Sequence, residues 1–380
     1  MREEEWGFEF GVYKRPFRQP LRTAHGVWQR REGIILRLTD PAGNVSFGEI
    51  APVPWFGSET LEAAVAFCQK LPARITGDMI RSIPEELPAC QFGFESASRP
   101  IAPGGSTNVR QINPGIHVNP DIYVNPDIPL SPASIPCPLS PVPGFAGSAS
   151  QPLESFSHSQ LLPAGKLCLS AWQPLWGAGY RTFKWKIGVG AIAQELEIFH
   201  QLIQRLPAAA RLRLDANGSL GYDEAARWLQ ACDQLSTDAL VVEYLEQPLA
   251  PAHLESMQVL SQQFRTAIAL DESVANLTQL QSCYAQGWRG VFVIKPAIAG
   301  FPTRLRQFCQ ETGIDVVVSS VFETAIGQNA LLHLAADLMT HPRAIGFGLD
   351  HWFLDRDPAL RLNGEDLWQW LQRCSRLTAV

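Results

Sequence analysis

Cysteines are sparse in this sequence and none of them are paired. Eight cysteines occur among 380 residues, and no two form a Cys-x-x-Cys motif. Disulfide scaffolds and zinc-binding modules need closely spaced cysteines. We therefore expect reduced thiols in a cytoplasmic protein, without structural disulfides and without zinc.

Long apolar runs and an excess of basic residues are missing as well. No run approaches the ~20 apolar residues that cross a bilayer, and the acidic start at residues 1–5 does not read as a signal peptide. The balance of 31 Lys+Arg against 37 Asp+Glu gives a formal charge of −6, unlike the basic footprint of a nucleic-acid-binding protein. We expect a small-molecule substrate, no nucleic-acid or membrane partner, and a monomer or weak homo-oligomer.

The rest of the composition is that of a globular protein, with 46% hydrophobic residues. At about 100–200 residues per domain, the length fits two domains and an insertion. Residues 1–98 are expected to form an α+β domain. Alternating runs predict about three strands, separated in part by a turn at 40–44, and a helix is expected to begin near Ser58. The three runs are Phe8–Tyr13, Gly33–Leu38 and Val45–Ile50.

Residues 99–158 interrupt this pattern. Twelve of the 29 prolines fall there, and a six-residue unit beginning Asn-Pro repeats three times from Asn113 to Leu130. Regularly spaced prolines remove the donors of a strand ladder, and three copies cannot build a solenoid core. We expect a disordered or loosely attached surface insertion; a tether that binds a partner is the alternative.

Residues 159–350 alternate short apolar runs with amphipathic stretches such as Ala193–Leu206. This alternation predicts parallel βα units, and eight of them predict a barrel. Residues 351–380 are expected to pack back on the first domain. The eight predicted strands are Leu161–Ala164, Thr182–Ile187, Arg211–Leu214, Leu240–Leu245, Thr266–Leu270, Gly290–Ile294, Asp315–Val318 and Ala344–Gly348.

Nearly every one of these runs ends in polar or charged residues. The strand ends of a parallel barrel lie at one mouth, where such enzymes carry their sites. Side chains two apart on a strand share a face, so Lys184 is expected to point with Lys186. The spacings along the chain are 29, 31, 25, 24 and 24 residues, about one βα unit each, for Lys186, Asp215, Glu246, Asp271, Lys295 and Ser319.

Three of these strand-end residues, Asp215, Glu246 and Asp271, form a set of hard oxygen donors. No histidine or cysteine shares their positions, so Mg²⁺ fits best, and Mn²⁺ could replace it. The crowding of Lys186 by Lys184 and a cation favours the neutral amine that a general base needs. The implied reaction is removal of a proton α to a carboxylate, with Mg²⁺ stabilising the enediolate.

Six ordered motifs resemble the o-succinylbenzoate synthase family of the enolase superfamily, in which a lysine base with Mg²⁺ is the known pattern. The resemblance covers residues 1–97 and 159–350. It implies a modified (β/α)₇β barrel, α/β in class, with an N-terminal α+β capping domain. The motifs are Gly179–Gly188, Leu212–Gly218, Glu243–Pro248, Ala269–Ser273, Val293–Pro296 and Ser319-Ser320.

The same resemblance implies an activity and roles for residues. The family is a hydro-lyase that dehydrates 2-succinyl-6-hydroxy-2,4-cyclohexadiene-1-carboxylate to 2-succinylbenzoate, a step toward menaquinone or phylloquinone. Two capping loops, Gln19–Gly26 and Ala51–Gly57, would close over the mouth. The implied roles are metal ligand for Asp215, Glu246 and Asp271, base and then acid for Lys186, enediolate stabiliser for Lys295, and succinyl contact for Ser319 and Ser320.

Four further residues are candidate substrate contacts, each with an open alternative. Lys184 could be only a charged neighbour, and Arg22 a surface charge. Arg213 could instead pair with Glu243 inside the barrel. Asn217 could be a hydrogen-bonding group behind the metal ligands.

Two rival functions remain open. The first is a dipeptide epimerase or N-acylamino acid racemase, in which both lysines exchange protons and Asp350 would bind a substrate ammonium. The second is an inactive binding or scaffold protein that uses the proline-rich insertion.

Overall fold

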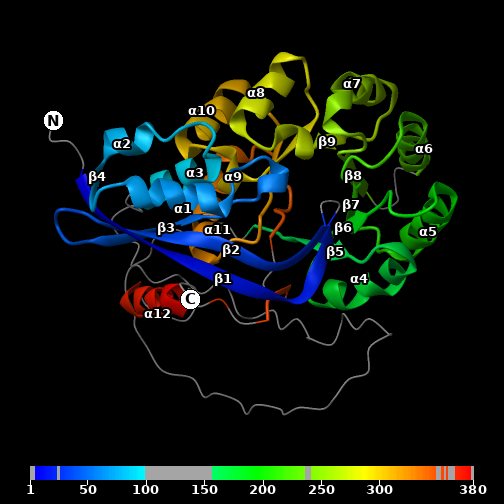
Figure 1. The fold of residues 1–380 in the computed structure, drawn as a ribbon. Helices are drawn as coiled ribbons and strands as arrows, with labels where there is room; N and C mark the ends of the chain where they lie inside the picture. The colour runs from blue at the N-terminus through cyan, green and yellow to red at the C-terminus, as the bar shows by residue number, and fades with distance from the viewer. Residues whose placement is uncertain are drawn as a thin grey trace, which may run out of the picture.

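The computed structural model describes residues 5–23, 26–98, 156–235, 241–347, 352–354, 357 and 364–377. Two sheets dominate it (Figure 1): a four-stranded antiparallel sheet of order β3-β2-β1-β4 and a seven-stranded parallel sheet of order β11-β10-β9-β8-β7-β6-β5. Helices ring the outside of the parallel sheet, while helices from three parts of the chain cover the antiparallel one.

The antiparallel sheet contains β1 (Glu5–Thr23), β2 (Gly26–Thr39), β3 (Val45–Ile50) and β4 (Arg74–Thr76). The predicted turn at 40–44 is confirmed, because the Asp40 carboxylate accepts hydrogen bonds from the amides of Ala42 and Asn44. The prediction for β1 was too short. Pro16 and Pro20 punctuate the sequence, but the strand runs on through a register irregularity between Pro16 and Leu21.

Three helices cover one face of this sheet or its edge: α1 (Leu61–Lys70), α2 (Gly77–Arg81) and α3 (Pro88–Ser98). The first helix begins later than predicted. Thr60 caps it by accepting from the Ala63 amide at 3.1 Å, whereas the Ser58 hydroxyl accepts from the Val53 amide at 2.6 Å. Ser58 therefore holds the preceding loop.

The parallel sheet contains seven of the eight predicted strands, and the eighth is reduced to two isolated bridges. Residues 345 and 346 make only isolated parallel bridges, His158↔Ile345 and Ser319↔Gly346, and these lie between the sheet's two edges, β5 and β11. A Cβ on Gly346 would lie 2.8 Å from Ser319 Oγ, so a larger residue there would require Ser319 to shift. The barrel prediction is confirmed. The seven strands are β5 (Ser159–Leu162), β6 (Thr182–Lys186), β7 (Arg211–Asp215), β8 (Val241–Glu246), β9 (Ile268–Leu270), β10 (Val291–Ile294) and β11 (Val316–Val318).

The outer helices bury apolar faces against the strands. Between β6 and its helices, Trp185, Phe199 and Trp228 pack edge to face. None of the helices in the described ranges is both long and apolar enough to traverse a bilayer. The helices are α4 (Cys168–Gly177), α5 (Ile192–Arg205), α6 (Tyr222–Asp233), α7 (Leu254–Gln263), α8 (Leu277–Ala285), α9 (Pro296–Ala299), α10 (Pro302–Thr312) and α11 (Ala325–Leu338).

The C-terminal helix α12 (Gly364–Leu377) lies against the antiparallel sheet, on the side away from α1 and α3 (Figure 1). Leu367, Trp368 and Leu371 share a buried cluster with Tyr13 and Ile35 from that sheet. The C-terminal helix therefore packs on the N-terminal sheet. The domain boundaries at 98, 158 and 350 stay a proposal.

We predict that truncating this cluster unfolds the protein more easily. Leu371 is fully buried, so Leu371→Ala should lower the free energy of unfolding by about 2–5 kcal/mol through lost burial and a residual cavity. Denaturant titration followed by circular dichroism measures it. The matched control is Leu354→Ala, because Leu354 is 62% exposed. Equal effects of the two substitutions would contradict the packing.

Candidate active site

Three of the predicted site residues stand level with one another at the carboxyl ends of neighbouring strands, and two more follow the ends of the next two strands. Lys186 of β6 pairs in register with Asp215 of β7, and Asp215 with Glu246 of β8. Glu246 pairs with Ala269, two residues before Asp271. Lys295 directly follows β10. The carboxylates therefore lie between the two lysines along one side of the barrel mouth.

The three carboxylates are buried and are balanced by ammonium groups. Asp215, Glu246 and Asp271 are 7%, 1% and 4% exposed, and buried charges need partners. Lys184 Nζ lies 2.8 Å from Asp215 Oδ2 and 2.7 Å from Glu246 Oε1. Lys295 donates to Asp271. The site is thus a compact group of opposite charges.

Burial and neighbouring charges shift the pKa values of two residues in this group, Glu246 and Lys184. Burial raises the pKa of Glu246 to about 8; Lys184 opposes this, and Asp215 and Asp271 add to it. Burial acts to lower the pKa of Lys184, but the three carboxylates outweigh burial and hold it well above its usual value. Lys184 therefore carries its charge among the carboxylates.

The donor set suits a hard divalent cation. Its ligating atoms are carboxylate oxygens, as Mg²⁺ prefers, and one ammonium nitrogen touches two of these carboxylates at once. Beside them, the buried Oε2 of Glu272 has no hydrogen-bond partner among the residues that the structure describes. Within the described ranges, no three acidic, histidine or cysteine side chains stand close enough to hold a metal as placed. The lysines bond the oxygens that a cation would use.

Two residues hold the carboxylate-bearing loops, and both have positive φ. Gln247 (φ 36) was not predicted. Its Oε1 accepts from the Asp271 amide at 2.9 Å and its Nε2 donates to Ser273 Oγ at 2.7 Å. Asn217 (φ 44) donates from Nδ2 to Glu272 at 3.0 Å, and its amide donates to Asp215. Asn217 therefore bonds Asp215 and Glu272, as expected of a group behind the metal ligands, and its role stays a prediction.

Two predicted substrate contacts are buried and bonded within the chain. Arg213 is 1% exposed; its Nε donates to Glu243 at 2.6 Å and its Nη2 to the Ala344 carbonyl at 2.8 Å. It shares a face with Asp215 but lies one layer deeper, in the ion pair with Glu243 that was the open alternative to substrate contact. Ser320 is also buried, and its hydroxyl donates to Glu323 and accepts from the Phe322 amide.

Ser319 keeps its predicted place. It follows β11, one residue beyond the registered pair Ile294 and Val318, and so lies beside Lys295. Its side chain is half-buried and makes no hydrogen bond within the described part of the chain. The side chain of Arg22 lies outside the described residues, as do Asp350 and the repeat at 113–130.

The antiparallel sheet contributes a wall to the mouth. Of the two predicted capping loops, Ala51–Gly57 carries Phe56, whose ring centroid lies 3.8 Å from Lys295 Nζ. Next to it, Trp55 packs edge to face on Trp28 of β2 at 4.9 Å. Phe56 therefore brings the antiparallel sheet's domain into contact with one of the two lysines.

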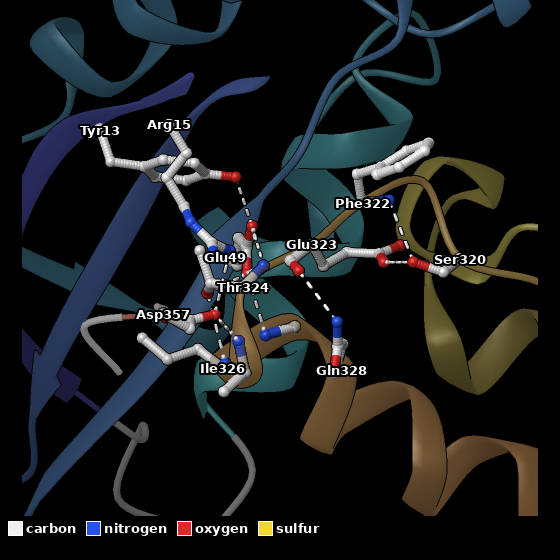
Figure 2. Close-up of polar contacts among 12 residues, drawn as sticks. Tyr13, Arg15, Glu49, Ser320, Phe322, Glu323, Thr324, Ile326, Gln328 and Asp357 are labelled. Atoms are coloured by element: carbon white, nitrogen blue, oxygen red, sulfur yellow. Dashed lines mark hydrogen bonds and ion pairs between the residues drawn. The ribbon is translucent and has the colours of Figure 1, made fainter. Parts of the chain in front are cut away.

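A second acidic cluster lies behind this wall and was missed (Figure 2). Glu49 of β3 accepts from Tyr13 Oη at 2.5 Å, and from the amides of Thr324 and Gly327 at the start of α11. Burial raises the pKa of Glu49 despite these bonds. Glu323 accepts from the Val321 amide at 2.9 Å, and burial raises its pKa to about 7 against the Ser320 hydrogen bond.

Comparisons with known proteins agree with this geometry. A family model described as "Enolase C-terminal domain-like" matches residues 170–362, and one described as "MenC, N-terminal domain" matches residues 12–101. The o-succinylbenzoate synthase of Thermosynechococcus vestitus is 37% identical over 91% of this chain and 93% of its own length.

Solved structures show the same relationship. The o-succinylbenzoate synthase from Thermosynechococcus elongatus BP-1, with Mg in its active site, superposes with a TM-score of 0.75 and 36% identity, covering 96% of this chain and 99% of that one. A dipeptide epimerase from Enterococcus faecalis, bound to Mg and L-Leu-L-Tyr, shares the fold at a TM-score of 0.67 and 20% identity, covering 93% of each chain.

The barrel, its capping sheet and the strand-end carboxylates with their lysines define a member of the enolase superfamily. Within this superfamily, the similarity to o-succinylbenzoate synthases extends over nearly the whole chain, both in sequence and in structure. The chain belongs to the o-succinylbenzoate synthase family.

We predict that Glu323 makes stability depend on pH. Its raised pKa means that the folded state holds this proton more tightly, so the stabilisation is complete below about pH 4.5 and is lost as pH rises through about 7. Glu323→Gln cannot titrate. Between pH 5 and pH 8 it should therefore gain about 3 kcal/mol relative to the wild type, at about 1.4 kcal/mol per pH unit. Urea unfolding at both pH values tests this, with exposed Glu62→Gln as control; a pH-independent difference would contradict it.

Proposed function

We propose that this chain catalyses the Mg²⁺-dependent syn-dehydration of 2-succinyl-6-hydroxy-2,4-cyclohexadiene-1-carboxylate to 2-succinylbenzoate. It is then a carbon–oxygen hydro-lyase of menaquinone or phylloquinone biosynthesis. The observation that carries the proposal is the pair Lys186 and Lys295 flanking three buried carboxylates at the barrel mouth, in a chain similar to o-succinylbenzoate synthases over nearly its full length.

Asp215, Glu246 and Asp271 are the residues that would hold the cation. When bound, the cation supplies positive charge at the substrate carboxylate, which lowers the cost of removing the neighbouring proton. The other contributions come from the chain's own side chains. Mn²⁺ as a substitute belongs to the same proposal.

Lys186 is the base in this proposal. It stands level with Asp215 on the next strand, and within the described ranges its amine has no hydrogen-bond or ion-pair partner. It takes the proton α to the carboxylate and returns it to the hydroxyl that leaves from the adjacent ring carbon. One C–H and one C–O bond break, water departs, and the ring becomes aromatic. Because one amine performs both transfers, the elimination is syn.

Lys295 acts from the other side. Its ammonium is held between Asp271 and the Phe56 ring, where it stabilises the negative charge that develops as the proton leaves. Lys184 bonds Asp215 and Glu246 and holds these carboxylates in place. The aromatic wall at Trp28, Trp55 and Phe56 keeps bulk water from the reacting atoms.

A racemase or epimerase is the second candidate, because an amine on each side of the carboxylates also permits proton exchange on both faces. The inactive-scaffold alternative depends on the insertion predicted at 99–158, of which residues 99–155 lie outside the described part. A cytoplasmic location is supported by six free, buried cysteines among the described residues, and a monomer or weak homo-oligomer stays part of the proposal.

We predict that Lys186→Ala removes dehydration while the fold is retained. General-base catalysis typically contributes about 10²–10⁴-fold, so kcat should fall by at least that range. Absorbance of the aromatic product gives the rate, and circular dichroism checks the fold. Lys166→Ala, at an exposed position, is the matched control. A near-normal kcat for the Lys186 variant would refute its assignment as the base.

We predict that Asp215→Asn weakens Mg²⁺ binding. Loss of a group that merely orients a ligand typically costs 10–100-fold in affinity, so loss of a ligand charge should cost at least about tenfold. Calorimetric titration with Mg²⁺ alone measures this without substrate. Asp223→Asn, on the exposed face of α6, should bind as the wild type does. An unchanged affinity in Asp215→Asn would exclude it as a ligand.

A further inference from the structure

The loop between β11 and α11 joins the barrel mouth to the antiparallel sheet. Ser319 and Ser320 hold its beginning, because their amides donate to the carbonyls of Ile294 at 2.8 Å and Gly346 at 3.1 Å. Ile294 directly precedes Lys295. The loop therefore starts beside the ammonium group that the proposed reaction uses.

Within the loop, Phe322 has φ +66. A left-handed backbone costs an aromatic residue about 1–3 kcal/mol and persists only where the surroundings impose it. Glu323 imposes it here: its carboxylate accepts from the Ser320 hydroxyl and from the Val321 amide, while the Phe322 amide donates back to Ser320 at 3.0 Å. Figure 2 shows the Glu323 side chain reaching back toward Ser320.

This conformation directs Phe322 onto the antiparallel sheet. Its ring lies 5.3 Å from Phe17 of β1 and 5.4 Å from Trp28 of β2. Trp28 in turn packs on Trp55, the neighbour of Phe56 under Lys295. The aromatic side chains thus form a continuous path from the β11 loop to the wall of the mouth.

Glu49 anchors the other side of the same loop. It accepts from the Thr324 amide and hydroxyl and from the Gly327 amide, and a Cβ at position 327 would lie 2.8 Å from the Glu49 carboxylate. Asp357 accepts from the Ala325 amide at 2.7 Å. The first amides of α11 are therefore held by carboxylates from distant parts of the chain, which fixes the loop relative to both sheets.

We propose that Glu323 is a positioning residue for the reaction: by holding Ser320 and Phe322, it sets the conformation of the β11–α11 loop and, through Phe17 and Trp28, the placement of the wall that faces the substrate. The inference rests on the proposed function for the location of the substrate. It does not involve the metal ligands, none of which bonds this loop.

Glu323→Ala removes both hydrogen bonds, whereas Glu323→Gln keeps an amide of nearly the same shape. Misplacement of binding groups by about 1 Å can cost about 10²-fold. We expect kcat/KM of Glu323→Ala to fall about 10²-fold, most of it restored in Glu323→Gln. Affinity for Mg²⁺ alone, measured calorimetrically, should be unchanged. If Glu323 only stabilised the fold, its replacement by Ala would not lower kcat/KM while leaving the affinity for Mg²⁺ unchanged.

Asp233→Ala is the matched control. Asp233, the last residue of α6, also holds a loop, through the amides of Arg265 and Thr266 and the Thr266 hydroxyl. That loop precedes β9, at the end of the barrel opposite the mouth. Asp233→Ala should lower the unfolding temperature without changing kcat/KM. If Glu323→Ala does not fold, Phe322→Gly replaces it, because glycine accepts φ +66 without strain and removes the aromatic contacts.

The outcomes distinguish two failures. The positioning role would be overturned if the wild type is active and Glu323→Ala has the same kcat/KM as Asp233→Ala. The same holds for Phe322→Gly where it replaces Glu323→Ala. A folded wild type that binds Mg²⁺ but does not dehydrate the cyclohexadiene would overturn the proposed function instead.

Discussion

Burial of three carboxylates beside one another at a barrel mouth is the constraint on which the site depends. Such a group is unfavourable unless positive charge is placed among its oxygens. Lys184 and Lys295 supply that charge in the structure, and a divalent cation would supply it in the proposed enzyme. The same requirement explains why Gln247 and Asn217 adopt strained backbone conformations to hold the acid-bearing loops.

The antiparallel sheet is more than a cover for the barrel. Phe56 lies against Lys295, and Glu49 bonds the start of α11. One part of the sheet therefore meets the reacting groups, and another part fixes the barrel loop that lies beside them. The C-terminal helix packs on the same face of this sheet as Glu49, because its buried cluster includes Ile35, which pairs in register with Glu49.

Local patterns predicted the barrel and the chemistry of its mouth well. Strands such as β6 and β7 end in charged residues after apolar runs, and their spacing repeats with each βα unit, so the level of Lys186, Asp215 and Glu246 could be predicted. The depth at which a side chain lies within the barrel could not be predicted. The two-residue period puts Arg213 on the same face as Asp215 and leaves open whether it contacts substrate or pairs with Glu243. The structure places its guanidinium on Glu243, one layer below the mouth.

Long-range pairing was also beyond prediction from sequence. Glu49 and Thr324 are separated by 275 residues, and no periodicity connects them. The repeat at 113–130, which is prominent in the sequence, lies outside the described residues, and its role remains a hypothesis. The likeness to o-succinylbenzoate synthases covers nearly the whole chain, so the proposed activity does not depend on that repeat.

The most direct test of the central claim is a substrate comparison with controlled metal. The purified chain, stripped with EDTA and then supplied with Mg²⁺, is assayed with the cyclohexadiene carboxylate and with a panel of dipeptides. The account predicts dehydration that is lost with EDTA and restored by Mg²⁺. Dipeptide epimerisation without dehydration, or dehydration indifferent to Mg²⁺, would contradict it.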